Sequence, residues 1–240
     1  MKQRETFPDI LRTAATCAVV LLHTVTGVMD HTDMSQYPVQ GRVFQALLDL
    51  TCWCVPVFVM ISGYFFLDPK RELTFRLMLT RYCRRIALAL FLFGVPYAWL
   101  ELVLSERAFR IGMAGEGFWM VLRGETWSHM WYLYLILFLY LLTPALRYLL
   151  NRLPKPVIWG ILAVLFLGSS VQPYVMKLFG LELPVVIPDW GIYFFYYVCG
   201  YLFATGGRKR TGRGRKTGMV CMIILVLLFL GMTASRFLGN

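Results

Sequence analysis

Long apolar runs separated by short polar segments recur along the whole chain. Seven of them approach the roughly 20 residues that an α-helix needs to cross a bilayer at a rise of about 1.5 Å per residue. They cover residues 10–29, 44–66, 86–104, 127–149, 156–173, 189–205 and 218–238. No polar block between them is long enough to fold by itself. The pattern predicts an all-α, polytopic membrane protein with about seven transmembrane helices in a single membrane-embedded domain, residues 1–240.

Composition supports this class of protein. Hydrophobic residues make up 58% of the chain and charged residues 15%, with a mean hydropathy of +0.62, whereas soluble domains are roughly 45–50% apolar. The six cysteines, at positions 17, 52, 54, 83, 199 and 221, lie mostly inside apolar runs and lack CxxC spacing. We interpret them as small buried residues and expect neither disulfides nor a metal site.

Basic residues alternate between the loops. Residues 1–12, 67–85, 147–155 and 206–217 hold 18 of the 24 lysines and arginines, and the positive-inside rule makes their side cytoplasmic. The N-terminus is then cytoplasmic, and the loops near 30–43, 105–126 and 174–188, the second of which carries Glu116 and Trp119, face outward. The run GGRKRTGRGRK (206–216) is explained as a topology signal, so we expect no nucleic-acid partner.

The first helix carries two groups that are costly to bury, Arg12 and His23. They are eleven residues apart, almost three helical turns, so they share one face about 16 Å apart along the axis. Arg12 lies at the cytoplasmic end, where it can snorkel and pair with Asp9. His23 lies past the midplane, where an ionisable group favours a functional site, although a histidine satisfied by a neighbouring carbonyl is an alternative. Imidazole can serve as a general base near neutral pH.

The second helix ends in Ser62, Gly63 and Tyr64, near the cytoplasmic side and at about the depth of Arg12. Small residues at this position favour close helix packing. The next loop contains RYCRRI, in which Arg81 and Arg84 form an RxxR pair. Such a pair can clamp phosphates or can anchor the helix at the inner surface, and spacing alone favours the anchor.

The fourth helix begins with an aromatic belt that includes Trp131, and His129 lies among these aromatic residues. A belt at the membrane interface explains the aromatic side chains but not His129. The histidine lies at an outer depth from which it could approach His23 across the bundle.

Five motifs in register carry a resemblance to a known family. They are R-x10-H in the first helix, VPVFVMISGYFF in the second, the RxxR after it, HMWYLYLILFLYLLTP in the fourth, and YFFYYVCGYLF in the sixth. Together they resemble the integral membrane acyltransferase family 3, over residues 8–205. Members of that family O-acylate surface and exported glycans.

The resemblance implies a role for individual residues. His23 matches the family's catalytic histidine, and Arg12 matches its essential partner. Arg81 and Arg84 match the RxxR pair implicated with the acyl-CoA donor, and Arg85 leaves that alignment ambiguous by one position. The signature Ser62, Gly63 and Tyr64 is grouped with the donor site, and Trp131 matches the family's tryptophan.

The resemblance also implies the substrates and the location. We expect no bound cofactor, acyl-CoA (in particular acetyl-CoA) as the donor, and an envelope glycan or lipid-linked sugar as the acceptor, in a protein surrounded by lipids of a bacterial cytoplasmic membrane. The family usually has about ten helices, so its C-terminal helices are expected to be absent from these 240 residues. A shortened or inactive fragment and a transporter are the alternatives; repeated halves or broken helices, typical of transporters, are not evident.

Overall fold

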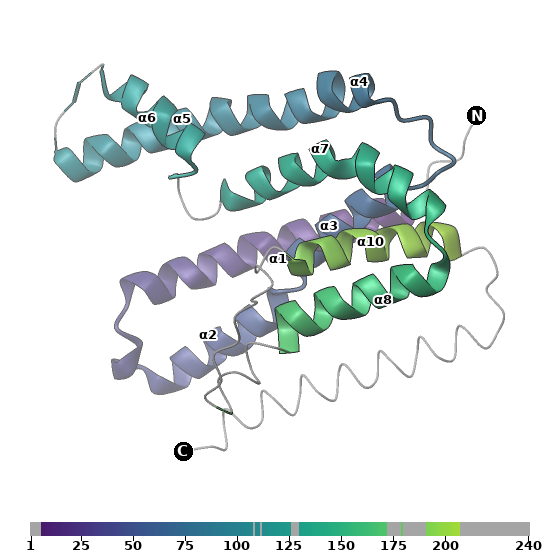
Figure 1. Cartoon of the computed structure of the whole chain (residues 1–240). Coiled ribbons are helices and arrows are strands. Elements are labelled where there is room, and N and C mark those ends of the chain that lie inside the picture. The colour runs from purple at the N-terminus through teal and green to yellow at the C-terminus, as the bar shows by residue number, and fades with distance from the viewer. Residues whose placement is uncertain are drawn as a thin grey trace. The chain divides into compact units, whose positions relative to one another are not determined.

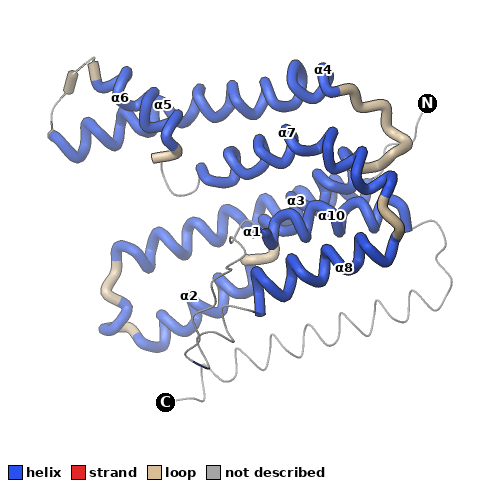
Figure 2. The backbone as a smooth tube through the Cα atoms, viewed as in Figure 1, coloured by secondary structure: helices blue, strands red, loops and turns tan. Residues whose placement is uncertain are grey.

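The computed structural model describes residues 6–107, 109–110, 112–125, 130–171, 179 and 191–206. Over these residues the backbone forms helices joined by short loops, and no strand is present among them (Figure 1, Figure 2). The seventh predicted helix, 218–238, lies outside the described residues, as do His129 and the basic run from residue 207 onward.

Four helical segments are long and apolar enough to cross a membrane: Thr6–Asp30, Pro38–Phe66, Phe75–Glu106 and Trp131–Arg152. Two shorter apolar helices follow them, Lys155–Ser170 and Gly191–Leu202. These segments correspond to the first six predicted helices. The prediction of an all-α, multi-pass membrane protein is confirmed.

The second predicted helix is broken into α2 (Pro38–Thr51) and α3 (Cys54–Phe66). Pro56 accounts for the break, because a proline has no N–H to donate and its ring clashes with the carbonyl group four residues earlier. The short η1 (Met34–Gln36) precedes α2 and follows α1 (Thr6–His31).

Two predicted loops contain helix instead. The third helix begins at Phe75 rather than near residue 86, as α4 (Phe75–Leu77), the π-helical η2 (Met78–Cys83) and α5 (Arg84–Glu106). The predicted outer loop 105–126 contains α6 (Met113–Arg123). Hydropathy windows missed both, because arginines 81, 84 and 85 interrupt the first and because α6, at eleven residues, is too short to span a membrane. The remaining helices are α7 (Trp131–Arg152), α8 (Lys155–Phe166) with η4 (Leu167–Val171), and α10 (Gly191–Gly206).

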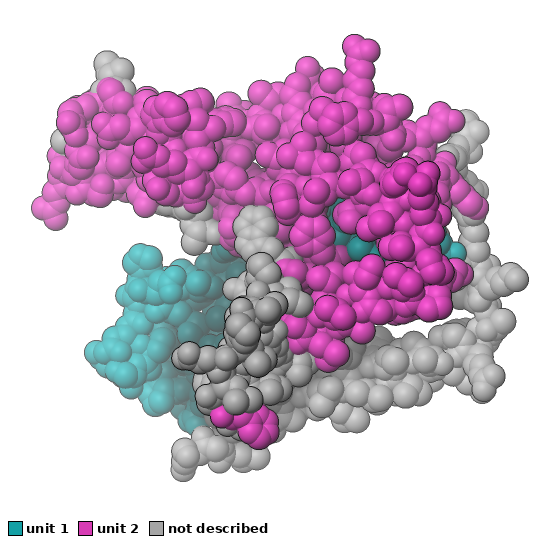
Figure 3. All heavy atoms as spheres, in the orientation of Figure 1, with its two compact units in different colours: residues 1–65, 195–240 teal, residues 66–194 magenta. Residues whose placement is uncertain are grey.

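The chain divides into two compact units, coloured separately in Figure 3. The first consists of residues 1–65 and 195–240, and the second of residues 66–194. Each is described by itself below.

In the first unit, α1 packs on α3 through small side chains. Ala15, Ala18 and Cys54 are buried together, with partly buried residues such as Val19 and Phe58 around them. Small residues of this kind let helix backbones approach closely within a membrane.

The closest helix contact of the first unit joins α3 to α10. A Cβ atom built on Gly63 would overlap the carbonyl oxygen of Tyr197, and one built on Gly200 would overlap the carbonyl oxygen of Met60. The two glycines therefore make a reciprocal backbone contact that no larger residue permits. Gly63 has the packing role that the sequence favoured for it.

The second unit is built around α5, α6 and α7. Three residues from different helices are buried together: Leu90 of α5, Val121 of α6 and Met130 at the start of α7. The hydroxyl group of Tyr134 on α7 donates a hydrogen bond of 2.5 Å to the carbonyl of Val121 on α6. Beyond this cluster α5 and α6 continue as a hairpin past the N-terminal end of α7 (Figure 1).

Candidate functional site

Arg12 lies over an aromatic ring of the signature helix. Its guanidinium carbon is 5.0 Å from the centre of the Phe65 ring on α3, and its Nη1 atom is 3.5 Å from the carboxylate of Asp9. Asp9 and Phe65 thus both contact the guanidinium, and the side chain remains 45% exposed. The predicted pair with Asp9 and the predicted level of Arg12 near Tyr64 are both confirmed.

His23 lies on the same side of α1 as Arg12, three turns further along. The packed side of α1 includes Ala15, Ala18 and Val25, and the turn of 100° per residue puts Arg12 and His23 along its edge. Both side chains are exposed. The helix therefore offers two ionisable groups along one edge, about 16 Å apart.

The signature residues Ser62, Gly63 and Tyr64 meet different partners. The Ser62 hydroxyl donates to the carbonyl of Phe58 at 3.0 Å within its own helix. Gly63 packs against α10 as described, and the ring of Tyr64 lies edge-on to Phe65 at 5.3 Å. Packing accounts for Gly63, and the assignment of the three residues to donor binding remains a prediction.

The RxxR arginines belong to the second unit and lie where η2 passes into α5. Arg81 is in the π-helical turn, with its guanidinium carbon 5.8 Å from the centre of the Tyr82 ring. Arg84 and Arg85 open α5, and all three side chains are exposed. A π turn takes in an extra residue and is frequent at functional sites.

Aromatic contacts fix the level of these arginines along α7. The ring of Phe66 lies 4.7 Å from that of Tyr82 on η2 and 4.7 Å from that of Tyr140 on α7. One to two turns further, Leu90 packs with Met130 and Leu133 at the start of α7. Arg84 and Arg85 lie between these two levels, so they are near the middle of α7. Their location at the inner surface of the membrane stays a prediction.

Arg147 on α7 has a structural role in addition to its positive charge near the end of the helix. Its guanidinium donates to the carbonyl of Phe66 at 3.0 Å and to the carbonyl of Arg71 at 2.6 Å. It thereby caps the last residue of α3 and holds the start of the loop that leads to α4. The spacing of Tyr140, Thr143 and Arg147 on one side of an otherwise apolar helix was the available signal.

Trp131 contacts an aromatic residue of the sixth-helix motif. Its ring lies 5.3 Å from that of Tyr193, at the start of α10, and one side of Trp131 stays exposed. His129 lies outside the described residues, so its approach to His23 remains a prediction.

The only acid outside the membrane-spanning segments with a resolved shift is Asp33, among the described residues. Hydrogen bonds from the Ser35 hydroxyl, the Gln36 amide and the Ser35 N–H lower the pKa of this carboxyl below its usual value. Asp33 thus stays ionised and caps η1. Its stabilising contribution is present above the unfolded pKa and is lost only as the pH falls through the lower folded pKa.

The site residues fall into two groups, one in each unit. Arg12, His23 and the signature of α3 belong to the first. The arginines of η2 and α5 belong to the second, together with Trp131. Within each group a basic side chain lies beside an aromatic ring at a helix turn, which suits binding of an anionic group next to an apolar one.

Comparison with known proteins gives the family. A family model described as an acyltransferase domain matches residues 5–239, nearly the whole chain. No curated protein and no solved structure matches the chain. The matched region includes both groups of site residues. The chain belongs to acyltransferase family 3.

Proposed function

We propose that this membrane acyltransferase transfers an acetyl group from cytoplasmic acetyl-CoA to a hydroxyl group of an envelope glycan or lipid-linked sugar. We place it in the cytoplasmic membrane of a bacterium, with its N-terminus in the cytoplasm. The membership of the family supports acyl transfer in general. The donor is supported by the positions of the arginines, and the acceptor and the location by the resemblance of the sequence motifs to the family.

The level of Arg84 and Arg85 along α7 is the observation that carries the proposal. Cations near the middle of a membrane helix are costly and mark substrate paths. Acyl-CoA is a polyanion, and guanidinium groups bind phosphates through paired hydrogen bonds. Arginines at this depth can draw the donor below the membrane surface, which brings its thioester toward the far end of the path.

Arg12 is assigned to the donor rather than to His23. The two residues are about 16 Å apart along α1, so Arg12 cannot orient the imidazole directly. Its guanidinium, contacted by Asp9 and by the ring of Phe65, suits a phosphate group of an acyl-CoA donor. His23 then acts where the acceptor arrives from outside.

His23 is assigned the proton transfer. The acceptor oxygen attacks the thioester carbonyl carbon, a C–O bond forms, and the C–S bond breaks. The imidazole takes the hydroxyl proton and passes it to the departing thiolate, which leaves as CoA thiol. In the alternative route the imidazole receives the acyl group first and gives it to the acceptor in a second step. Both routes need the side chain of His23.

The test measures CoA thiol released from acetyl-CoA by the purified chain in lipid vesicles, with envelope glycans as acceptors. We expect His23→Ala to lower the rate at least about 100-fold, the typical contribution of a general base. His31→Ala is the matched control, because His31 is an exposed histidine of the same helix that bonds only to the carbonyl of Gly27 among the described residues. Equal rates for the wild type and His23→Ala would contradict the assigned role.

A further inference from the structure

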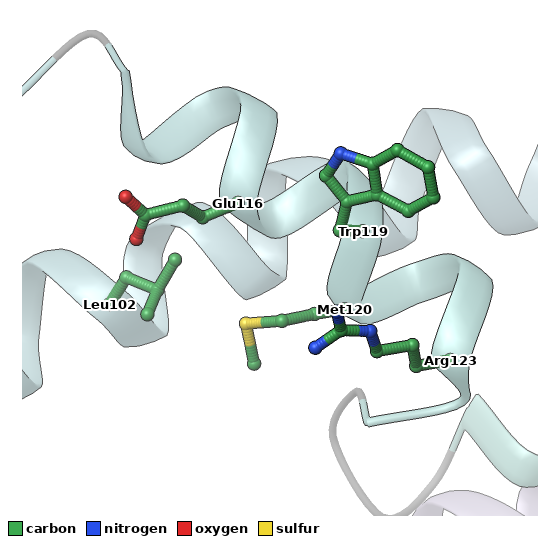
Figure 4. A pocket seen from close by; sticks show the side chains of 5 residues that line it. All are labelled: Leu102, Glu116, Trp119, Met120 and Arg123. Atoms are coloured by element: carbon green, nitrogen blue, oxygen red, sulfur yellow. The ribbon is translucent and has the colours of Figure 1, made fainter.

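The α5–α6 hairpin contains a cavity that the proposed chemistry does not use. It has a volume of about 390 Å³ and is lined by Leu102 of α5 and by Glu116, Trp119, Met120 and Arg123 of α6 (Figure 4). Small-molecule sites measure about 300–1,000 Å³ and combine an apolar lining with a few polar groups. The cavity meets both conditions.

One face of α6 supplies four of the five lining residues. Residues 116, 119, 120 and 123 have the spacing i, i+3, i+4 and i+7, which puts them on a single side of a helix. Figure 4 shows the carboxylate of Glu116 at one end of this stripe and the guanidinium of Arg123 at the other, with Met120 between them. Among the described residues, neither charged side chain has a hydrogen-bond or ion-pair partner.

A different face of α6 holds the hairpin together. Met113, Gly117 and Val121 are buried, and a Cβ atom on Gly117 would lie 3.1 Å from the backbone nitrogen of Trp99. Three of the lining residues, Glu116, Trp119 and Arg123, are exposed and lie outside this packed face. Folding does not explain why an apolar hairpin carries an acid, a base and an exposed indole on one side.

The cavity runs along the hairpin from about the level of the start of α7, where Val121 packs with Met130, to Leu102 beyond that level. A Cβ atom on Gly94 would lie 3.5 Å from Met130, so the start of α7 is level with Gly94. Leu102 is eight residues further along α5, or about 12 Å. The segment Phe75–Glu106 has 32 residues, about 48 Å, against a hydrocarbon core of about 30 Å. The orientation predicted from the basic residues places the Glu106 end of this segment on the outer side of the membrane.

The chemistry of the lining selects a class of ligand. A lipid chain has no group that can bond to Glu116 or Arg123, and a phosphate can bond to Arg123 but has no donor for the carboxylate of Glu116. A neutral molecule with several hydroxyl groups can satisfy both charges, and its C–H face can lie on the indole of Trp119. Sugar rings have this combination of one apolar face and many hydroxyl groups.

We propose that this cavity is an outer carbohydrate subsite that holds a neutral sugar unit of the acceptor. As an acceptor subsite it rests on the proposed function, while binding of the sugar itself does not. Trp119 supplies the stacking surface, Glu116 accepts hydrogen bonds from hydroxyl groups, and Arg123 donates to hydroxyl oxygens. The three residues position the acceptor and take no part in proton transfer.

The test measures binding of soluble neutral trisaccharides (chitotriose, maltotriose and mannotriose) to the full chain in nanodiscs without any acyl donor. We expect Trp119→Ala to weaken binding of the preferred trisaccharide about tenfold or more, and Trp119→Phe to retain most of it. Glu116→Gln should weaken it as well. Trp159→Ala on α8 is the matched control, because Trp159 is as exposed as Trp119 and does not line the cavity.

Two outcomes would overturn the subsite. One is absence of trisaccharide binding by the wild type, and the other is equal weakening by Trp119→Ala and Trp159→Ala. Glycerol 1-phosphate in the same assay separates a lipid headgroup from a sugar, and tighter binding of this anion would also overturn the proposal. Release of CoA thiol is measured separately, so binding without release would contradict the proposed transfer and leave the subsite standing.

Discussion

Two of the candidate donor-binding arginines lie beside aromatic rings. Arg12 lies over Phe65, and Arg81 lies beside Tyr82. A guanidinium is attracted by an aromatic face without using its hydrogen-bond donors, and among the described residues only Nη1 of Arg12 also approaches a carboxylate, that of Asp9 at 3.5 Å. Arg147 differs, since two backbone carbonyls occupy it. Single residues therefore separate into cations that can bind a ligand and one that holds the fold.

The double substitution Arg81→Ala with Arg84→Ala tests this division. Charge-assisted hydrogen bonds contribute about 1.5–3 kcal/mol each, and about 1.4 kcal/mol is tenfold in affinity. We expect the KM for acetyl-CoA to rise about tenfold or more, with a smaller change in kcat. The matched control is Arg107→Ala with Arg110→Ala, which removes the same charge from the far end of α5, where Arg110 pairs with Glu106. An unchanged KM in the first variant would make the pair a membrane anchor.

At the scale of elements, the contact between α3 and α10 depends on two glycines. Gly63→Ala would push a methyl group into the carbonyl of Tyr197. Overpacking of this kind costs about 1–3 kcal/mol, so we expect the Tm of the reconstituted protein to fall by several degrees. Gly27→Ala is the control, because Gly27 lies inside α1 with no atom near its would-be Cβ, and alanine there should keep or raise the Tm. A Tm for Gly63→Ala at or above that of the wild type would contradict the reciprocal contact.

The sequence predicted the helices that hydropathy can detect and missed those that it cannot. Long apolar runs located the six helices that lie within the described residues. Pro56 alone does not predict the break between α2 and α3, because many membrane helices tolerate a proline. The segment η2 was predicted as a loop, because its arginine lowers the mean hydropathy of any window that contains it. The short α6 gave no signal of a spanning helix, although its buried face repeats every four residues.

The sequence identified the candidate residues, but it did not give their level along the neighbouring helices. The R-x10-H spacing fixed Arg12 and His23 on one face, since helix periodicity needs only the sequence. The level of Arg84 along α7 depends on which rings meet Phe66, and that is a tertiary contact. The cavity on α6 was likewise invisible, because it needs Leu102 from a second helix.

At the scale of the whole molecule, the proposal requires a defined orientation in the membrane. Single cysteines in a cysteine-free variant test it, at Lys70 in the loop before α4 and at Gly115 on α6, both exposed positions. We expect a membrane-impermeant thiol reagent to label Gly115→Cys, and not Lys70→Cys, in right-side-out vesicles. The reverse pattern would invert the positive-inside assignment and would place the cavity on the donor side.

The separation of two faces on α6 has a consequence for how such a protein can change over evolutionary time. Residues 113, 117 and 121 are buried within the hairpin, whereas residues 116, 119 and 123 are exposed where they line the cavity. Substitution at the second set leaves the first untouched, so a lineage can acquire a new ligand preference without losing a folded intermediate. The hairpin thereby behaves as an interchangeable recognition module on a constant membrane enzyme.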